Sequence, residues 1–177
     1  MNDELTARIA SAQGVIAEAT ACAMAYFERR SDLSVDCKAN AQDLVSEADR
    51  GVEALIRDRL TRAFPDDSLL GEELGLAPGR GGWTWIIDPI DGTSSFLHGL
   101  QGWSISVALS HDGLTRAGWV SHPCGNAVYA AARGQGAWCG TSRLMVSQGT
   151  SLSDGLTAMG SGAPEVIAAM VQEVLAS

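Results

Sequence analysis

The sequence predicts an α+β protein in which two N-terminal helices pack on a mainly antiparallel sheet. Over most of the first 64 residues, apolar side chains recur every three or four positions, the period of a helix with one buried face. Between residues 68 and 139 the period changes to two, which is typical of strands. The connections between the later strands are too short for crossover helices, so these strands are expected to pair antiparallel. Helices first and strands later favour a layered sandwich.

The first thirty residues are expected to form one helix, and a second helix is expected from Asp43 to Phe64, where Pro65 ends it. The first apolar stripe comprises Leu5, Ile9, Ala12, Ile16, Ala19, Ala23 and Tyr26, and the second comprises Val52, Leu55, Ile56, Leu60 and Ala63. Between the helices, residues 34–38 are compatible with a short strand.

Strands are predicted at residues 68–70, 83–87, 103–110, 114–121, 127–133 and 136–139, with a short helix at 92–99. The segment Leu76–Gly82 is rich in glycine and proline and is expected to be a loop. From Gly149 the sequence becomes rich in glycine and serine, which is typical of a domain boundary. We therefore expect one domain over residues 1–148 and the beginning of a truncated second α/β domain over 149–177.

Composition excludes several classes of protein. The chain has 177 residues and a formal net charge of −9, and Lys38 is its only lysine, which argues against a nucleic-acid partner. No apolar run approaches the ~20 residues of a membrane span, and the acidic start is unlike a signal peptide, so a cytoplasmic location is expected.

The four cysteines form no CxxC pair and are expected to be reduced thiols. The negative charge serves either solubility or the collection of cations.

Three acidic segments stand at the predicted ends of elements: residues 43–49, Gly71-Glu72-Glu73 and Asp88-Pro89-Ile90-Asp91-Gly92-Thr93. In the last, a proline fixes the backbone between two aspartates, and the glycine opens a helix whose free N–H groups could bind an anion. Carboxylates beside an anion site would repel the anion unless cations lay between them. Oxygen ligands without Cys or His favour magnesium. An Asp-Pro-x-Asp-Gly stretch alone is also compatible with a simple turn.

The segment Trp85–Gly99, read with Gly71-Glu72-Glu73 and residues 43–49, closely resembles the signature of the inositol monophosphatase family of magnesium-dependent, lithium-sensitive phosphatases. Segments 104–109, 117–120 and 134–138 also fit, so the resemblance runs from the first helix to at least Ser147. It implies a sugar-phosphatase-like fold, two or three magnesium ions per site and a homodimer. It also implies a small phosphorylated polyol or sugar as substrate, with neither nucleic acid nor membrane as a partner.

The resemblance also implies roles for individual residues. Glu72, Asp88 and the carbonyl of Ile90 would bind the first magnesium ion, and Asp88 and Asp91 the second. Asp91, Gly92 and Thr93 would bind the substrate and its phosphate, while Thr93 and Asp49 would orient and deprotonate the attacking water. Lys38 is either a site-lining lysine or a solvated one, and Glu73 either supports the ligands or is solvated.

The implied activity is hydrolysis of inositol monophosphate or a related small phosphate by metal-activated water, without a covalent intermediate. Relatives also use histidinol phosphate, fructose bisphosphate or phosphoadenosine nucleotides, and residues 95–99 favour the inositol branch. The family's later Trp-Asp motif has no match, since Trp138 is the last tryptophan and Asp154 the last aspartate. We therefore expect impaired activity, or alternatively an inactive relative that acts as a metal-binding, phosphate-binding or assembly module.

Overall fold

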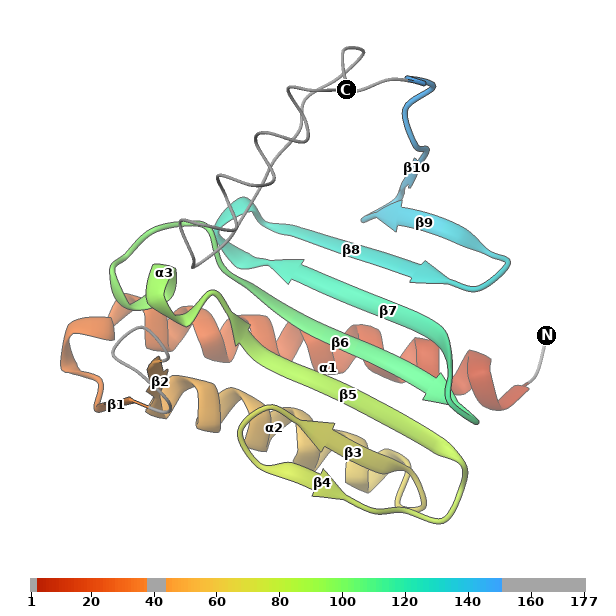
Figure 1. The fold of residues 1–177 in the computed structure, drawn as a ribbon, viewed down its shortest axis with the longest axis horizontal. Helices are drawn as coiled ribbons and strands as arrows, with labels where there is room; N and C mark the ends of the chain where they lie inside the picture. Colours follow the sequence, from red (N-terminus) through yellow and green to blue (C-terminus); the bar gives the residue numbers. More distant parts are fainter. Residues whose placement is uncertain (1–2, 38–43, 151–177) are drawn as a thin grey trace, which may run out of the picture. The chain divides into compact units, whose positions relative to one another are not determined.

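The computed structural model describes residues 3–37 and 44–150 (Figure 1). Contacts divide the chain into two units, Met1–Leu144 and Met145–Ser177, and all of the described helices and strands belong to the first. No helix in the described part of the chain is long and apolar enough to cross a membrane.

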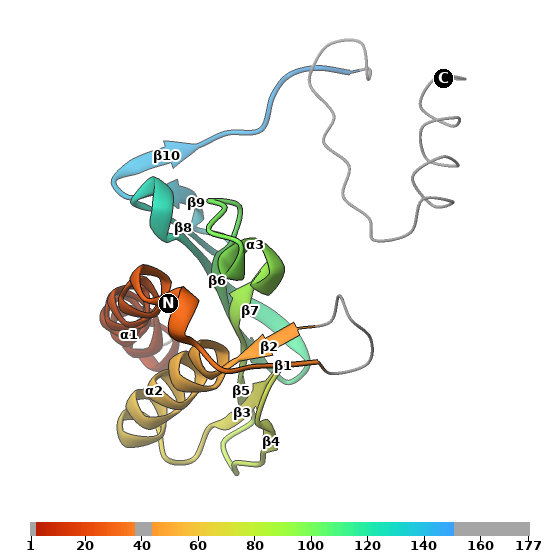
Figure 2. The same ribbon diagram turned by 90° about the vertical axis from the view of Figure 1, so that its left-hand side faces the viewer.

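Two long helices lie on one face of the main sheet, α1 (Asp3–Glu28) and α2 (Glu47–Ala63) (Figures 1 and 2). A 3-10 turn, η1 (Arg30–Asp32), follows α1, and a small antiparallel ladder of β1 (Val35–Cys37) and β2 (Leu44–Ser46) precedes α2. The predicted stripes face the sheet: Ala12, Ile16, Ala19 and Ala23 of α1 and Val52, Ile56 and Leu60 of α2 are buried in one core.

The main sheet has eight strands in the order β10-β9-β8-β7-β6-β5-β3-β4. The strands are β3 (Ser68–Gly71), β4 (Gly75–Ala77), β5 (Trp83–Asp91), β6 (Ser104–His111), β7 (Leu114–His122), β8 (Ala127–Ala132), β9 (Gly136–Cys139) and β10 (Ser142–Leu144). The short helix α3 (Thr93–Leu97) connects β5 to β6, and a 3-10 turn, η2 (Pro123–Gly125), connects β7 to β8. Every neighbouring pair is antiparallel except β3 and β5, which run parallel. The predicted α+β class is confirmed.

Several predicted boundaries were wrong. Helix α2 begins at Glu47, because Leu44–Ser46 pairs with β1 as a strand and the extended Ser46 caps the helix by accepting a hydrogen bond from the Ala48 N–H. Part of the predicted loop from Leu76 forms β4, whose three residues are exposed and so show no alternation. Strand β5 continues past Ile87 to Asp91, β10 was not predicted, and Ala63 of the second stripe is exposed.

Tryptophan side chains form a large part of the core between the helices and the sheet. Trp83, Trp85, Trp103 and Trp119 are buried, whereas Trp138 is partly exposed. The thiols of Cys22, Cys124 and Cys139 are free and partly buried, and the side chain of Cys37 lies outside the described part of the structure.

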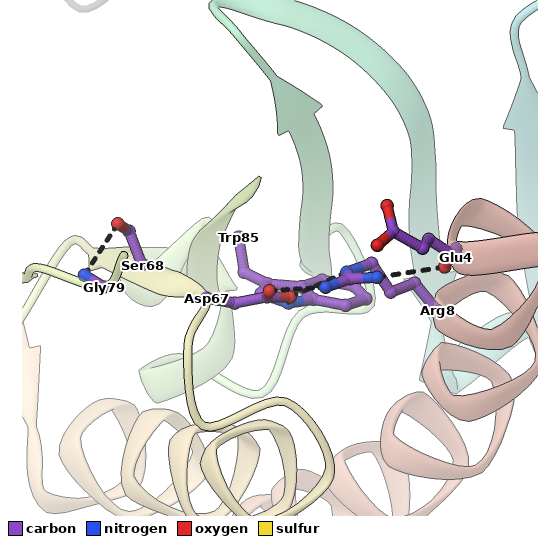
Figure 3. A network of polar contacts seen from close by, with 6 residues as sticks. All are labelled: Glu4, Arg8, Asp67, Ser68, Gly79 and Trp85. Carbon is purple, nitrogen blue, oxygen red and sulfur yellow. Dashed lines mark hydrogen bonds and ion pairs between the residues drawn. The ribbon is translucent and has the colours of Figure 1, made fainter. Parts of the chain in front are cut away.

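A buried ion pair joins α1 to the loop that follows α2 (Figure 3). Arg8 donates two hydrogen bonds to Asp67, at 2.6 and 2.9 Å, and the indole N–H of Trp85 donates to the same carboxylate at 2.8 Å. The guanidinium lies 4.5 Å from the ring centre of Trp83 and 4.7 Å from that of Phe64. The pair is thus bidentate, largely buried and in contact with two aromatic rings, a setting in which the loss of one partner is strongly destabilising.

Candidate functional site

A β-bulge places the two aspartates of β5 on the same face of the sheet. Residues three apart in a regular strand point to opposite faces. In β5, however, Asp88 pairs with Ser106 and Asp91 pairs with Ser104, so four residues of β5 oppose three of β6. Since Ser104 and Ser106 share a face of β6, Asp88 and Asp91 also share one. Pro89 lies within this irregularity and, without an N–H group, takes no part as a donor in the ladder.

The turn after the bulge requires glycine. Gly92 has φ +90° and caps α3, and a Cβ atom there would lie 2.9 Å from the carbonyl oxygen of Gly102. Thr93 then begins α3, a helix of only five residues. Its hydroxyl donates to Asp49 Oδ1 at 3.0 Å and lies 3.1 Å from the carbonyl oxygen of Ile90. The backbone at Ile90 and the first residue of α3 are thus fixed against each other.

Asp49 joins this turn to α2. It is 1% exposed, and its Oδ2 accepts hydrogen bonds from the Ser46 N–H at 2.8 Å and the Ser46 hydroxyl at 2.6 Å. Its other oxygen accepts from Thr93. The role of Ser46 was not predicted, although Ser-x-x-Asp at a helix start is a capping-box pattern that the sequence displays.

Glu72 reaches the same edge through the parallel pairing of β3 and β5. Gly71 pairs with Ile87, and the Glu72 N–H donates to the Ile87 carbonyl at 3.1 Å, so Glu72 follows β3 where Asp88 continues β5. The two residues line a depression of about 410 Å³, together with Leu70, Gly71, Ile86, Ile87, Ser106 and Ala108. Parallel pairing therefore brings together acids that lie 16 positions apart in the sequence.

The charges converge on Asp88. Burial raises the pKa of the Asp88 carboxyl to about 7, with further contributions from the charges of Glu72 and Asp91, a hydrogen bond shared with Glu72, and the charge of Asp49. Its Oδ1 is buried and has no hydrogen-bond partner among the described residues. A half-buried carboxylate among three others requires either a proton or a cation.

The donor set fits magnesium. The oxygens of Glu72, Asp88, Asp91 and the Ile90 carbonyl are hard donors. Asp88 Oδ1 has no hydrogen-bond partner among the described residues, so it can bind a cation without losing a hydrogen bond. No three Asp, Glu, His or Cys side chains within residues 3–37 and 44–150 converge closely enough to enclose an ion by themselves. Water molecules would therefore have to complete the coordination, as magnesium usually requires.

The remaining predicted residues lie at the margin or beyond it. Lys38 lies outside the described residues. Glu73 is partly buried and follows Glu72 in the turn between β3 and β4. Two histidines are partly buried: the ring of His111 lies 4.2 Å from that of Trp83, and His122 Nε2 lies 2.9 Å from the Gln101 carbonyl. His98 is exposed.

The raised pKa of Asp88 predicts a pH dependence of stability. Without metal, the folded chain binds a proton at Asp88 between the unfolded pKa of 3.8 and the folded pKa of about 7. The contribution of this group to stability is therefore fully present below pH 3.8 and is lost as the pH rises through 7. With EDTA present, Asp88→Asn should gain melting temperature relative to the unsubstituted chain as the pH rises from 5 to 8. A difference that stays constant over that range would contradict the shift.

Comparison with known proteins identifies relatives over most of the chain. The model of the inositol monophosphatase family matches residues 3–174. A histidinol-phosphatase of Chlorobaculum parvum is 44% identical over 122 residues, covering 69% of this chain and 46% of that protein. An inositol-1-monophosphatase of Rhizobium meliloti is 40% identical over 141 residues, covering 79% and 52%. The Nus factor SuhB of Pseudomonas aeruginosa is 37% identical over 141 residues, covering 78% and 51%.

Solved structures agree with the fold. The extragenic suppressor protein SuhB of Bartonella henselae superposes with a TM-score of 0.80 at 32% identity, covering 82% of this chain and 57% of that one. An inositol monophosphatase of Thermotoga maritima gives 0.74 at 33% identity, covering 82% and 56%. The chain spans about half the length of the relatives that it matches. On its sequence and its fold, the chain belongs to the inositol monophosphatase family.

Proposed function

We propose that the site of this chain serves a magnesium-dependent phosphomonoesterase that hydrolyses inositol monophosphate or a related small sugar or polyol phosphate. The observation that carries the proposal is the environment of Asp88. Its buried Oδ1 lacks a hydrogen-bond partner in the described part of the chain, and Glu72, Asp91 and Asp49 surround it with like charge. Such a cluster is favourable at neutral pH once divalent cations compensate it.

The ligand assignments follow from the donors at this edge. Glu72, Asp88 and the Ile90 carbonyl would bind one cation, and Asp88 and Asp91 would bind a second. When bound, magnesium would acidify a water molecule and stabilise negative charge on the phosphoryl oxygens. The N–H groups at Gly92 and Thr93 would bind the phosphate, because the first amides of a helix have no partner within the helix. Asp91 would contact both cation and substrate.

Thr93 and Asp49 would orient and deprotonate the attacking water. The Thr93 hydroxyl already donates to Asp49 Oδ1, and Ser46 holds the other oxygen of Asp49 through two hydrogen bonds. The carboxylate therefore has one oxygen fixed and one directed at the hydroxyl. This geometry supports a relay in which Thr93 orients the water and Asp49 receives the proton.

The class of substrate rests on the names of the relatives. Histidinol phosphate and inositol monophosphate, implied by two of them, are both phosphate monoesters of small polar alcohols. The SuhB relative from Pseudomonas aeruginosa is named as a Nus factor instead, a name that points to partners other than a small phosphate ester. The second candidate is therefore an inactive module for metal binding, phosphate binding or assembly. No residue here matches the family's later Trp-Asp motif, so we expect the chain alone to turn over slowly.

Release of inorganic phosphate tests the proposal. The 177-residue chain is incubated with inositol monophosphate, histidinol phosphate and fructose 1,6-bisphosphate, with magnesium or with EDTA. Magnesium-dependent release, well below that of the full-length Rhizobium meliloti relative, is expected from at least one substrate. Absence of release from every substrate would favour the inactive module, and turnover equal to the full-length relative would contradict the expected impairment.

Substitution of Thr93 tests the proton relay. Thr93→Val keeps the shape of the side chain but removes the hydroxyl, and the rate should fall by roughly a hundredfold or more, as for other losses of acid–base catalysis. Thr93→Ser keeps the hydroxyl and should stay within about tenfold of the original rate. Both variants should take up magnesium. Equal rates for the valine and serine variants would exclude the relay.

A further inference from the structure

One buried acid is not used by the proposed chemistry. Glu53 lies in the middle of α2, one helical turn after Asp49, and its side chain is fully buried. A carboxylate without partners at such a position would be strongly unfavourable. The partners of Glu53 therefore show what the residue does.

The hydrogen-bond partners of Glu53 are of two kinds: backbone amides in the loop that carries Glu72, and Arg57, which lies four residues later in α2. In this β3–β4 turn (Glu72–Leu74), the Glu73 N–H donates to Glu53 Oε2 at 2.8 Å and the Leu74 N–H donates to Oε1 at 3.2 Å. Arg57, four residues on, donates to Oε1 at 2.7 Å and also to the carbonyl of Gly75. The pair of Glu53 and Arg57 thus binds the backbone of the turn and of the residue after it.

The Glu53 carboxylate lies so close to Gly71, the residue just before the turn, that any larger residue there would displace it. A Cβ atom on Gly71 would lie 1.9 Å from Glu53 Oε1. On its other side, the Glu72 N–H is bound by the Ile87 carbonyl of β5. The backbone of Glu72 is therefore fixed between the Glu53 carboxylate and the strand that carries Asp88.

We propose that Glu53, held by Arg57, is a positioning residue that fixes Glu72 beside Asp88 for cation binding. This inference rests on the proposed function, in which Glu72 and Asp88 share a cation. Asp49 and Glu53 lie four residues apart on the same face of α2. A single helix therefore sets both sides of the site, Thr93 through Asp49 and Glu72 through Glu53.

The test combines backbone protection with metal affinity. Glu53→Gln keeps the volume but replaces one acceptor oxygen with a donor, so the Glu73 or Leu74 amide loses its partner. In EDTA, the hydrogen exchange of that amide, measured by NMR, should accelerate roughly tenfold or more. Magnesium affinity, measured by calorimetry, should fall roughly tenfold or more, as for other groups that orient metal ligands.

A control separates positioning from stability. Ile56→Val removes a methylene group from a fully buried residue of α2 that does not contact the turn through hydrogen bonds. It should lower the melting temperature yet leave both the exchange of the Glu73 and Leu74 amides and the magnesium affinity within about twofold. Arg57→Lys, which keeps the charge but loses the planar fork, should give changes between those of the control and Glu53→Gln, and it serves if Glu53→Gln does not fold.

The outcomes are distinct. The positioning role is overturned if Glu53→Gln or Arg57→Lys changes neither the amide exchange nor the magnesium affinity by more than Ile56→Val does. Faster exchange with unchanged magnesium affinity would also overturn it, because the turn would then be a structural element only. Failure of the unsubstituted chain to bind magnesium would refute the proposed function instead, since the exchange measurement needs no metal.

Discussion

Asp88→Asn is expected to abolish the response of the chain to magnesium. Asp88 is the carboxylate shared between the two proposed cation positions, its Oδ1 has no hydrogen-bond partner among the described residues, and an amide lacks the negative charge that attracts the cations. At a magnesium concentration about 100 times the dissociation constant, binding should stabilise the unsubstituted chain by roughly 2.7 kcal/mol. The variant should gain almost none of this, which thermal melts at pH 8 with magnesium and with EDTA will show.

Asp112→Asn is the matched control for this prediction. Asp112 carries the same carboxyl group in the turn between β6 and β7, where its side chain is 73% exposed. Its magnesium response should equal that of the unsubstituted chain. If Asp88→Asn responds to magnesium as strongly as Asp112→Asn, the cation site lies elsewhere.

Arg8→Met should cause a large loss of stability, because it breaks a buried ion pair. The Asp67 side chain is 1% exposed, so removing the guanidinium leaves a buried carboxylate with only the Trp85 indole as a described side-chain donor. Breaking a buried pair in this way costs about 3–5 kcal/mol. Methionine keeps an apolar side chain but lacks the guanidinium, so the loss reports the ion pair together with the contacts of the guanidinium to the Trp83 and Phe64 rings.

Arg59→Met provides the comparison by urea denaturation. Arg59 pairs with Glu18 and Asp58, but all three side chains are 39–50% exposed, and such pairs contribute about 0–1 kcal/mol. A loss for Arg8→Met within about 0.5 kcal/mol of that for Arg59→Met would mean that burial of the Arg8–Asp67 pair does not determine its contribution.

The strands that alternate most regularly were the most predictable part of the fold. In β6, the inward residues Ile105, Val107 and Leu109 are buried, and Ser106 and Ala108 between them are not. The start of α2 was not predictable from periodicity, because pairing with β1 takes Leu44–Ser46 out of the helix. Strand β4 gave no signal in the sequence, since all of its residues are exposed and it is ordered by pairing with β3 rather than by burial.

The candidate site shows the same division between local pattern and long-range pairing. The Asp-Pro-x-Asp-Gly stretch marked the acids of β5, but the bulge that places Asp88 and Asp91 on one face depends on pairing with β6. The adjacency of Glu72 depends on the parallel pairing of β3 with β5. Glu53 was missed because a charged residue in an amphipathic helix is expected to be solvated, and only the fold reveals that backbone amides bind it.

The direct test of the central claim is calorimetric titration of the 177-residue chain with magnesium at pH 6 and pH 8, in buffers that differ in ionisation enthalpy. If Asp88 is the central ligand, binding must expel its proton, because its pKa without metal is about 7. We predict proton release on binding at pH 6 that largely disappears at pH 8, and affinity that rises between them. Absence of binding, or binding without proton release at pH 6, would contradict the assignment of Asp88 to a cation site.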